Sequence, residues 1–210
     1  MKFLSTLDLS FAILAFSSLF SIINPISAAP IFVSMTEPSG RKKSALRATL
    51  AAAATLALFA LAGGAIFAFF GITVPAFQIA GGLLFAVMSI ETLLKDAPDT
   101  PEKHSDSDPS IVPLGIPLIA GPGAISTVMV LVGQAQSGFR IFALGFAILL
   151  NVVLTLLILL SAPWIQNKLG ITGQKIVTKI MGLMTAVIGI QFVINGSTTV
   201  FVEILKAART

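Results

Sequence analysis

Two proline dipeptides, Asn24-Pro25 and Gly121-Pro122, interrupt apolar stretches of the chain. Asn is among the best residues for capping a helix N-terminus, and Pro is favoured at the first helical position because its missing N–H needs no partner. Each dipeptide therefore predicts the start of a helix, with a weaker cap at Gly121. The free N–H groups and positive dipole end of such a helix can hold a carboxylate. The segments that end there leave carbonyl oxygens for an ammonium group or a cation.

The side chains around both dipeptides are small or carry hydroxyl groups. The candidate substrate-binding residues are Ser21, Asn24, Pro25, Ser27, Gly121, Pro122, Gly123, Ser126 and Thr127. A compact site with little charge of its own suits a small zwitterion. The alternative is that Pro and Gly only kink packed helices, while Ser and Thr bond to their own backbone. Two breaks at matching positions of two halves favour a binding role, because that pattern points to a transporter site.

The composition is that of an integral membrane protein. Hydrophobic residues make up 56% of the 210 residues and charged residues 10%, against about 25% charged in soluble domains. We expect one transmembrane domain over residues 1–210, in contact with the lipid bilayer. The basic residues sit between the spans with no aromatic interleaving, so no nucleic-acid partner is expected.

No cofactor, metal site or enzymatic activity is expected from the residues present. The chain has no cysteine, which excludes disulfides and thiolate metal sites, and it carries no phosphate loop or metal-ligand cluster. Glu91 is the one carboxylate within an expected span, close to its end, where it could be a snorkelling interfacial residue or a proton carrier.

Six apolar stretches are expected to cross the membrane: Leu9–Val33, Ala48–Phe70, Val74–Leu94, Ile111–Gly133, Ile141–Ser161 and Ile176–Asn195. The first is expected to be a span and not a cleaved signal, because Pro30 would follow the cleavage site. The fifth is expected to end at Pro163-Trp164, followed by a turn-rich loop at Asn167–Lys175. The polar segment at 95–110, with a solvated His104, is expected to be a loosely ordered loop between two halves.

The distribution of Lys and Arg predicts the orientation. Nine basic residues belong to one face, which holds the loops after spans 1, 3 and 5, and four belong to the other face. The first face is therefore expected in the cytoplasm, with both termini outside.

An internal repeat relates the two halves, residues 1–95 and 111–210. At an offset of 100 residues, five of the ten positions in 82–91 are identical, including Gly82/Gly182 and Ile90/Ile190. Spans 1 and 4 share only a helix-breaking proline at matching positions, Pro25 in span 1 and Pro122 in span 4. Because each half holds three spans, the second enters from the opposite side, so the repeats are expected to be inverted. Two convergent apolar helices are the alternative.

Other polar and small residues in the spans have a structural explanation. Hydrogen-bond partners between helices are expected at Gln78, Asn151, Thr155, Gln191 and Asn195, in preference to ligand contacts. Close helix packing is expected at Gly63-Gly64 and Gly81-Gly82.

These segments resemble the MarC family of bacterial inner-membrane proteins. The resemblance covers all six spans and rests on Asn24–Phe32, Gln78–Gly82, Val112–Ser126 and Ile180–Phe192. It implies six spans with both termini outside the cytoplasm. For SnatA-like members it also implies proton-coupled transport of glycine, alanine and similar amino acids. Ser27 departs from the family's first motif, which often has Gly there, and this difference is expected to affect cargo size or selectivity.

The sequence therefore predicts an all-α membrane protein with six helices in two inverted repeats, the first and fourth broken at mid-membrane. The expected function is secondary transport of small neutral amino acids across the bacterial inner membrane, with a proton or sodium as the possible coupling ion. Two alternatives stay open. One is a non-transporting assembly or stress-related member of the family, and the other is a membrane enzyme.

Overall fold

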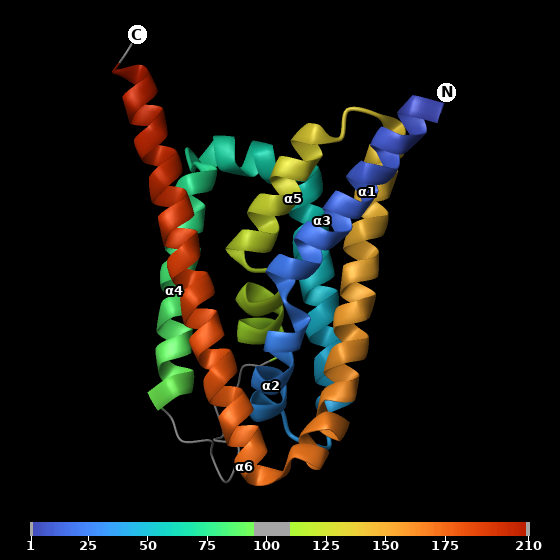
Figure 1. The fold of residues 1–210 in the computed structure, drawn as a ribbon, viewed down its shortest axis with the longest axis vertical. Helices are drawn as coiled ribbons and strands as arrows, with labels where there is room; N and C mark the ends of the chain where they lie inside the picture. Colours follow the sequence, from blue (N-terminus) through green and yellow to red (C-terminus); the bar gives the residue numbers. More distant parts are fainter. Residues whose placement is uncertain (1, 95–109, 209–210) are drawn as a thin grey trace.

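The regular secondary structure of the part that the structure describes is all helical, which confirms the all-α prediction. This computed structural model describes residues 2–94 and 110–208. The helices are α1 (Lys2–Ile23), α2 (Pro25–Met35), α3 (Arg41–Phe70), α4 (Val74–Leu94), the π-helix η1 (Ser110–Ile119), α5 (Pro122–Gln134) and α6 (Gly138–Ala207) (Figure 1). The predicted polar loop, with His104, lies outside the described residues apart from Ser110.

Five described segments are long and apolar enough to cross a membrane: Asp8–Val33, Arg41–Phe70, Val74–Glu91, Gly138–Trp164 and Lys175–Ala207. The predicted fourth span is not among them, because its helix is divided into η1 and the 13-residue α5. The start of α1 and the end of α6 lie at the same end of the molecule, which we call the terminal end (Figure 1). The fold is that of a multi-pass membrane protein.

The predicted bounds hold for α4 and fail at the start of α3. α4 covers Val74–Leu94 as predicted, but α3 begins at Arg41 and not at Ala48. The side chain of Arg41, the first residue of α3, donates to two carbonyl oxygens near the end of α2, those of Thr36 and Val33, each at 3.3 Å. The loop between the first two spans is correspondingly short.

α6 contains the fifth and sixth predicted spans. The fifth ends at Trp164, as predicted, although the helix itself continues through Pro163, and the expected turn-rich loop at Asn167–Lys175 is helical except at Gly170. Gly170 has φ 64° and ψ 177°, a conformation that glycine adopts readily because it lacks a Cβ. The chain changes direction there, so α6 has a first arm, Gly138–Trp164, and a second arm, Lys175–Ala207 (Figure 1).

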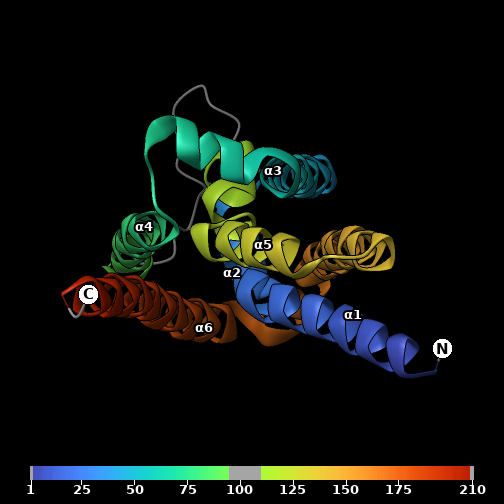
Figure 2. The same ribbon diagram turned by 90° about the horizontal axis from the view of Figure 1, so that it is seen from above.

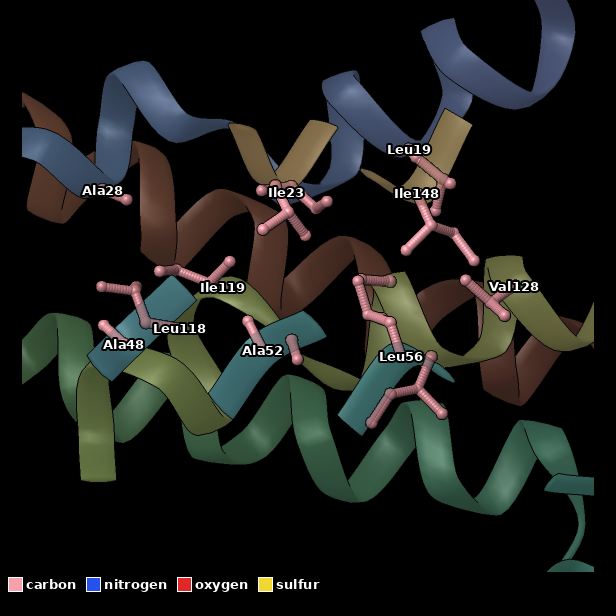
Figure 3. Close-up of a cluster of buried hydrophobic side chains, with 14 of the residues drawn as sticks. Leu19, Ile23, Ala28, Ala48, Ala52, Leu56, Leu118, Ile119, Val128 and Ile148 are labelled. Carbon is pink, nitrogen blue, oxygen red and sulfur yellow. The ribbon is translucent and has the colours of Figure 1, made fainter. Parts of the chain in front are cut away.

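One hydrophobic core joins the two broken helices to α3 and the first arm of α6. Ala45, Ala48 and Ala52 of α3 are wholly buried at a spacing of three and four residues, which places them on one helix face. Their small side chains allow close approach by η1, whose Leu118 and Ile119 lie beside them (Figure 3). The core thus holds α3 against η1 immediately before the second break.

α4 and the second arm of α6 run antiparallel beside each other, on the opposite side of α2 and α5 from α1 and α3 (Figures 1 and 2). A Cβ built on Gly82 would lie 2.4 Å from the Gly189 carbonyl oxygen, and one on Gly189 would lie 2.7 Å from the Gly82 oxygen. The predicted close packing at Gly82 is confirmed. The two repeat segments, 82–91 and 182–191, therefore lie on neighbouring helices.

The predicted packing role of Gly63-Gly64 is correct for only one of the two residues. A Cβ on Gly63 would lie 3.0 Å from the Met129 Cγ, which is close contact. A Cβ on Gly64 would meet no described atom within 4 Å. Neighbouring residues on a helix point about 100° apart, so only Gly63 faces α5.

Candidate functional site: two helix breaks and a groove

The first break is formed by Asn24 alone. α1 ends at Ile23 and α2 begins at Pro25, as predicted. Asn24 has φ 44° and ψ 62°, in the left-handed region that Asn tolerates better than most residues. Its Oδ1 accepts a hydrogen bond from the Ser27 N–H at 3.4 Å, which confirms the predicted N-cap.

The cap leaves one half of the Asn24 amide free. Ser27 and Ala28 donate their N–H groups to the Asn24 backbone oxygen, at 3.0 and 3.2 Å. The Asn24 Nδ2 donates to no acceptor among the described residues, and the residue is half-buried. Asn24 can therefore cap α2 through oxygen and still offer an N–H group to a ligand.

The second break is formed by Ala120 and Gly121. Gly121 has φ −75° and ψ 173° and provides no side-chain cap, so this helix start is the less satisfied of the two, as predicted. The Ile125 N–H donates to the Gly121 oxygen at 3.0 Å. The N–H groups of Gly123 and Ala124 precede that of Ile125 in the first turn of α5. The first N–H groups of a helix have no acceptor within the helix, so these two are available to a ligand.

Residues from α4 and the second arm of α6 enclose the second break. A Cβ on Gly81 would lie 1.8 Å from the Pro122 Cγ, and a Cβ on Gly123 would lie 2.0 Å from the Phe192 Cζ. The rings of Phe85 and Phe192 lie 5.9 Å apart between centroids. Sequence reasoning did not identify either ring as part of this region, because their positions look like ordinary apolar positions in a span.

The two breaks lie at about the same height in the bundle (Figure 1). Ile23 and Ile119, the last residues of α1 and η1, lie across the same core from each other (Figure 3). α1 and α2 run away from the terminal end while η1 and α5 run towards it (Figure 1). α2 and α5 therefore leave the level of the breaks in opposite directions.

An open groove of about 220 Å³ adjoins the second break. It lies between three helices and is lined by Leu14 and Ser18 of α1, Gln78 of α4, and Ser126, Thr127, Val130, Leu131 and Gln134 of α5. Sites for drug-sized ligands have roughly 300–1,000 Å³. The groove is therefore of a size for a small solute.

Gln78 and Ser126 join two helices inside this groove. The Gln78 Nε2 donates to the Ser126 Oγ at 3.1 Å, which confirms Gln78 as a hydrogen-bond partner between helices. The Ser126 hydroxyl donates in turn to the Gly123 carbonyl oxygen at 3.0 Å. Ser126 is buried, so this pair ties α4 to the first turns of α5.

The structure brings most of the candidate site residues to the two breaks, but not all. Pro25, Ser27, Gly121, Pro122, Gly123 and Ser126 are buried there, and Asn24 and Thr127 are half-buried. Ser126 and Thr127 also line the groove. Ser21 is exposed and is not part of the groove lining.

Asn151 joins α6 to α1. Its wholly buried side chain donates from Nδ2 to the Phe16 oxygen at 3.3 Å and to the Ala147 oxygen at 2.8 Å, so the prediction of an interhelical partner is confirmed. Its Oδ1 has no partner among the described residues.

The other polar residues bond within their own helix. Thr155 donates to the Asn151 oxygen at 2.7 Å, and Gln191 donates to the Asn195 Oδ1 at 2.7 Å, so neither prediction of an interhelical bond holds. Glu91 is exposed near the end of α4. The described residues contain no group of three or more His, Asp or Glu side chains that could hold a metal ion.

Comparison with known proteins identifies the family. The model of the MarC family of integral membrane proteins matches residues 9–201, which include both breaks, the first arm of α6 and most of the second. The chain belongs to the MarC family. MarC proteins similar to it occur in bacteria and archaea. The UPF0056 membrane protein YhcE of Escherichia coli is 34% identical over 91% of this chain and 94% of its own length.

Two archaeal relatives have sequences similar to this chain over nearly its whole length. A UPF0056 membrane protein of Methanocaldococcus jannaschii is 37% identical over 90% of this chain and 97% of its own length. A UPF0056 membrane protein of Pyrococcus abyssi is 40% identical over 89% of this chain and 94% of its own length. No solved structure matches the chain.

Proposed function

We propose that this MarC protein is a secondary transporter of small neutral amino acids such as glycine and alanine. One observation carries the proposal: two helix breaks lie at the same level, and the helices that start there, α2 and α5, run in opposite directions (Figure 1). Paired broken helices of this kind form the substrate sites of inverted-repeat transporters. Alternating access would then come from movement of one repeat against the other.

The proposal includes six crossings in two inverted repeats, residues 1–95 and 111–210, with the breaks at mid-membrane. η1 and α5 together would make the crossing that neither makes alone. The start of α1 and the end of α6 both lie at the terminal end, which supports an even number of crossings (Figure 1). From the basic residues we place the terminal end outside the cytoplasm, in a bacterial inner membrane.

The atoms left free at the breaks suit the two ends of a small amino acid. The Asn24 Nδ2 and the N–H groups of Gly123 and Ala124 would hold the carboxylate, aided by the positive end of α5. Carbonyl oxygens before the breaks, with the Ser126 hydroxyl, would hold the ammonium group. A proton or sodium ion is the proposed coupling ion.

Flux of labelled glycine and alanine into proteoliposomes tests the function. Uptake above empty vesicles is expected under a proton or a sodium gradient, and the gradient that drives it identifies the ion. Flux no greater than that of empty vesicles under both gradients would exclude transport of these amino acids.

Two further measurements separate transport from an assembly role and test the orientation. Glycine and alanine should raise the melting temperature of the purified protein, because a ligand that binds the native state stabilises it. An assembly subunit would show no such rise. Lys42→Cys, in a chain that has no other cysteine, should be protected from labelling outside the cell. Labelling from outside would reverse the proposed orientation.

A further inference from the structure

The groove extends from the second break towards the terminal end. Ser126, Val130 and Gln134 lie on one face of α5 at intervals of four residues. Eight residues of helix separate the first from the last, or about 12 Å. Gln134 is the final residue of α5 and is exposed, and this end of α5 points towards the terminal end (Figure 1).

Five of the eight residues that line the groove are polar. Gln78, Ser126 and Thr127 lie at the inner part and Gln134 at the outer part, with Ser18 contributed by α1. Polar residues at membrane depth usually face a water-filled cavity or a substrate path, because contact with lipid is costly. A volume of about 220 Å³ has room for several waters, each with a share of about 30 Å³ in the liquid.

Gln78 occupies the inner end of the groove and connects it to the break. Its Nε2 bonds to the Ser126 hydroxyl, which bonds to the Gly123 oxygen in the first turn of α5. The Gln78 Oε1 accepts no hydrogen bond from the described part of the chain. Gln78 therefore keeps an acceptor available for an ammonium group that reaches this position.

The level of the breaks is closed on the side of the core. Ile23 and Ile119 fill the space between α1 and η1, with Ala28 and Leu118 beyond them (Figure 3). These side chains are buried, so the path from the groove does not pass between them in this conformation.

We infer that the groove is the water-filled route by which a small amino acid reaches the second break from the terminal end, and that Gln78 contacts the cargo at the inner end of this route. The Gln78 Oε1 accepts from the cargo ammonium group. The inference rests on the proposed function for its cargo, while the route itself can be tested without any cargo.

Cysteine labelling tests the route, because the natural chain has no cysteine. Thr127→Cys places a thiol in the groove lining. Leu61→Cys is the control, since Leu61 lies on α3 with 90% exposure on an apolar helix and outside the groove. A charged, membrane-impermeant thiol reagent added at the terminal end should modify Thr127→Cys and spare Leu61→Cys. Equal resistance of the two thiols would overturn the route.

Protection by cargo tests Gln78. Excess glycine should slow the modification of Thr127→Cys. Adding Gln78→Met should raise the glycine concentration that gives half-maximal protection by about tenfold, because one hydrogen bond to a charged group is lost. Methionine has a similar shape, so the labelling rate without glycine should stay the same. If half-maximal protection needs the same glycine concentration with and without Gln78→Met, Gln78 does not contact the cargo.

The outcomes separate this inference from the proposed function. Flux of glycine with an unreactive Thr127→Cys would reject the route and keep the transporter. A reactive Thr127→Cys without flux of glycine or alanine would keep the route, reject the proposed function and remove the contact between Gln78 and these amino acids.

Discussion

Gly81 of α4 lies against the ring of Pro122, the first residue of α5. A Cβ on Gly81 would lie 1.8 Å from the Pro122 Cγ and 2.3 Å from its Cβ. A proline ring cannot rotate away as a flexible side chain can, so the backbone of α4 or of the break would have to move. The absence of a side chain at residue 81 thus allows α4 to reach the break.

Gly81→Ala is therefore expected to destabilise the protein. The overpacking cost is about 1–3 kcal/mol or more, and it should appear as a lower melting temperature in detergent. Gly64→Ala is the matched control, because a Cβ there meets no described atom within 4 Å and Ala is the better helix former. Equal melting temperatures for the two variants would show that Gly81 and Pro122 are not in contact.

Asn24 can be tested by substitutions that separate its two roles. Asn24→Asp retains the oxygen that accepts from Ser27, so the cap should persist, but an acidic group at the proposed mid-membrane level should lower the melting temperature. Asn24→Ala loses the cap and places alanine at φ 44°, with an expected cost of about 2 kcal/mol.

Uptake of labelled glycine should fall in both Asn24 variants, because neither Ala nor Asp carries the N–H donor proposed to bind the carboxylate. Insertion is checked by expression in the membrane fraction. Normal uptake by an inserted Asn24→Ala or Asn24→Asp would remove Asn24 from the site and leave it only its capping role.

Arg41 anchors the far end of α2. Its guanidinium donates to the carbonyl oxygens of Thr36 and Val33, and such charge-assisted bonds contribute about 1.5–3 kcal/mol. Arg41→Ala should lower the melting temperature accordingly, and Arg41→Lys should recover only part of it, because Lys lacks the planar fork. The neighbouring exposed Lys42 provides the control: Lys42→Ala should change stability by less than about 0.5 kcal/mol.

Arg140 joins the start of α6 to α1 through Asp8. The Arg140 Nε lies 3.1 Å from the Asp8 Oδ1, and its guanidinium lies 5.5 Å from the centre of the Phe11 ring. Both charged groups are partly exposed, so a double-mutant cycle of Arg140→Ala and Asp8→Ala should give a coupling energy of about 0.5–1 kcal/mol. The coupling should shrink at 1 M salt, and a value that does not change with salt would contradict an electrostatic origin.

The two breaks and several helix ends could be predicted from the sequence because they depend on neighbouring residues. Pro25 and Pro122 each begin a helix, Asn24 caps one of them, and α4 covers its predicted residues. Capping and the restricted backbone of proline act over one helical turn, so a short segment contains the whole cause.

The tertiary structure decided which side chains surround the breaks. Phe192 reaches Gly123 from a helix about 70 residues further along the chain, and Gln78 bonds to Ser126 across a separation of 48 residues. The sequence also did not predict that the helix continues through Pro163. The sequence by itself determined the membrane class, the family and the breaks. The groove and its contacts depended on how distant helices pack, because their residue types are equally compatible with many apolar neighbours.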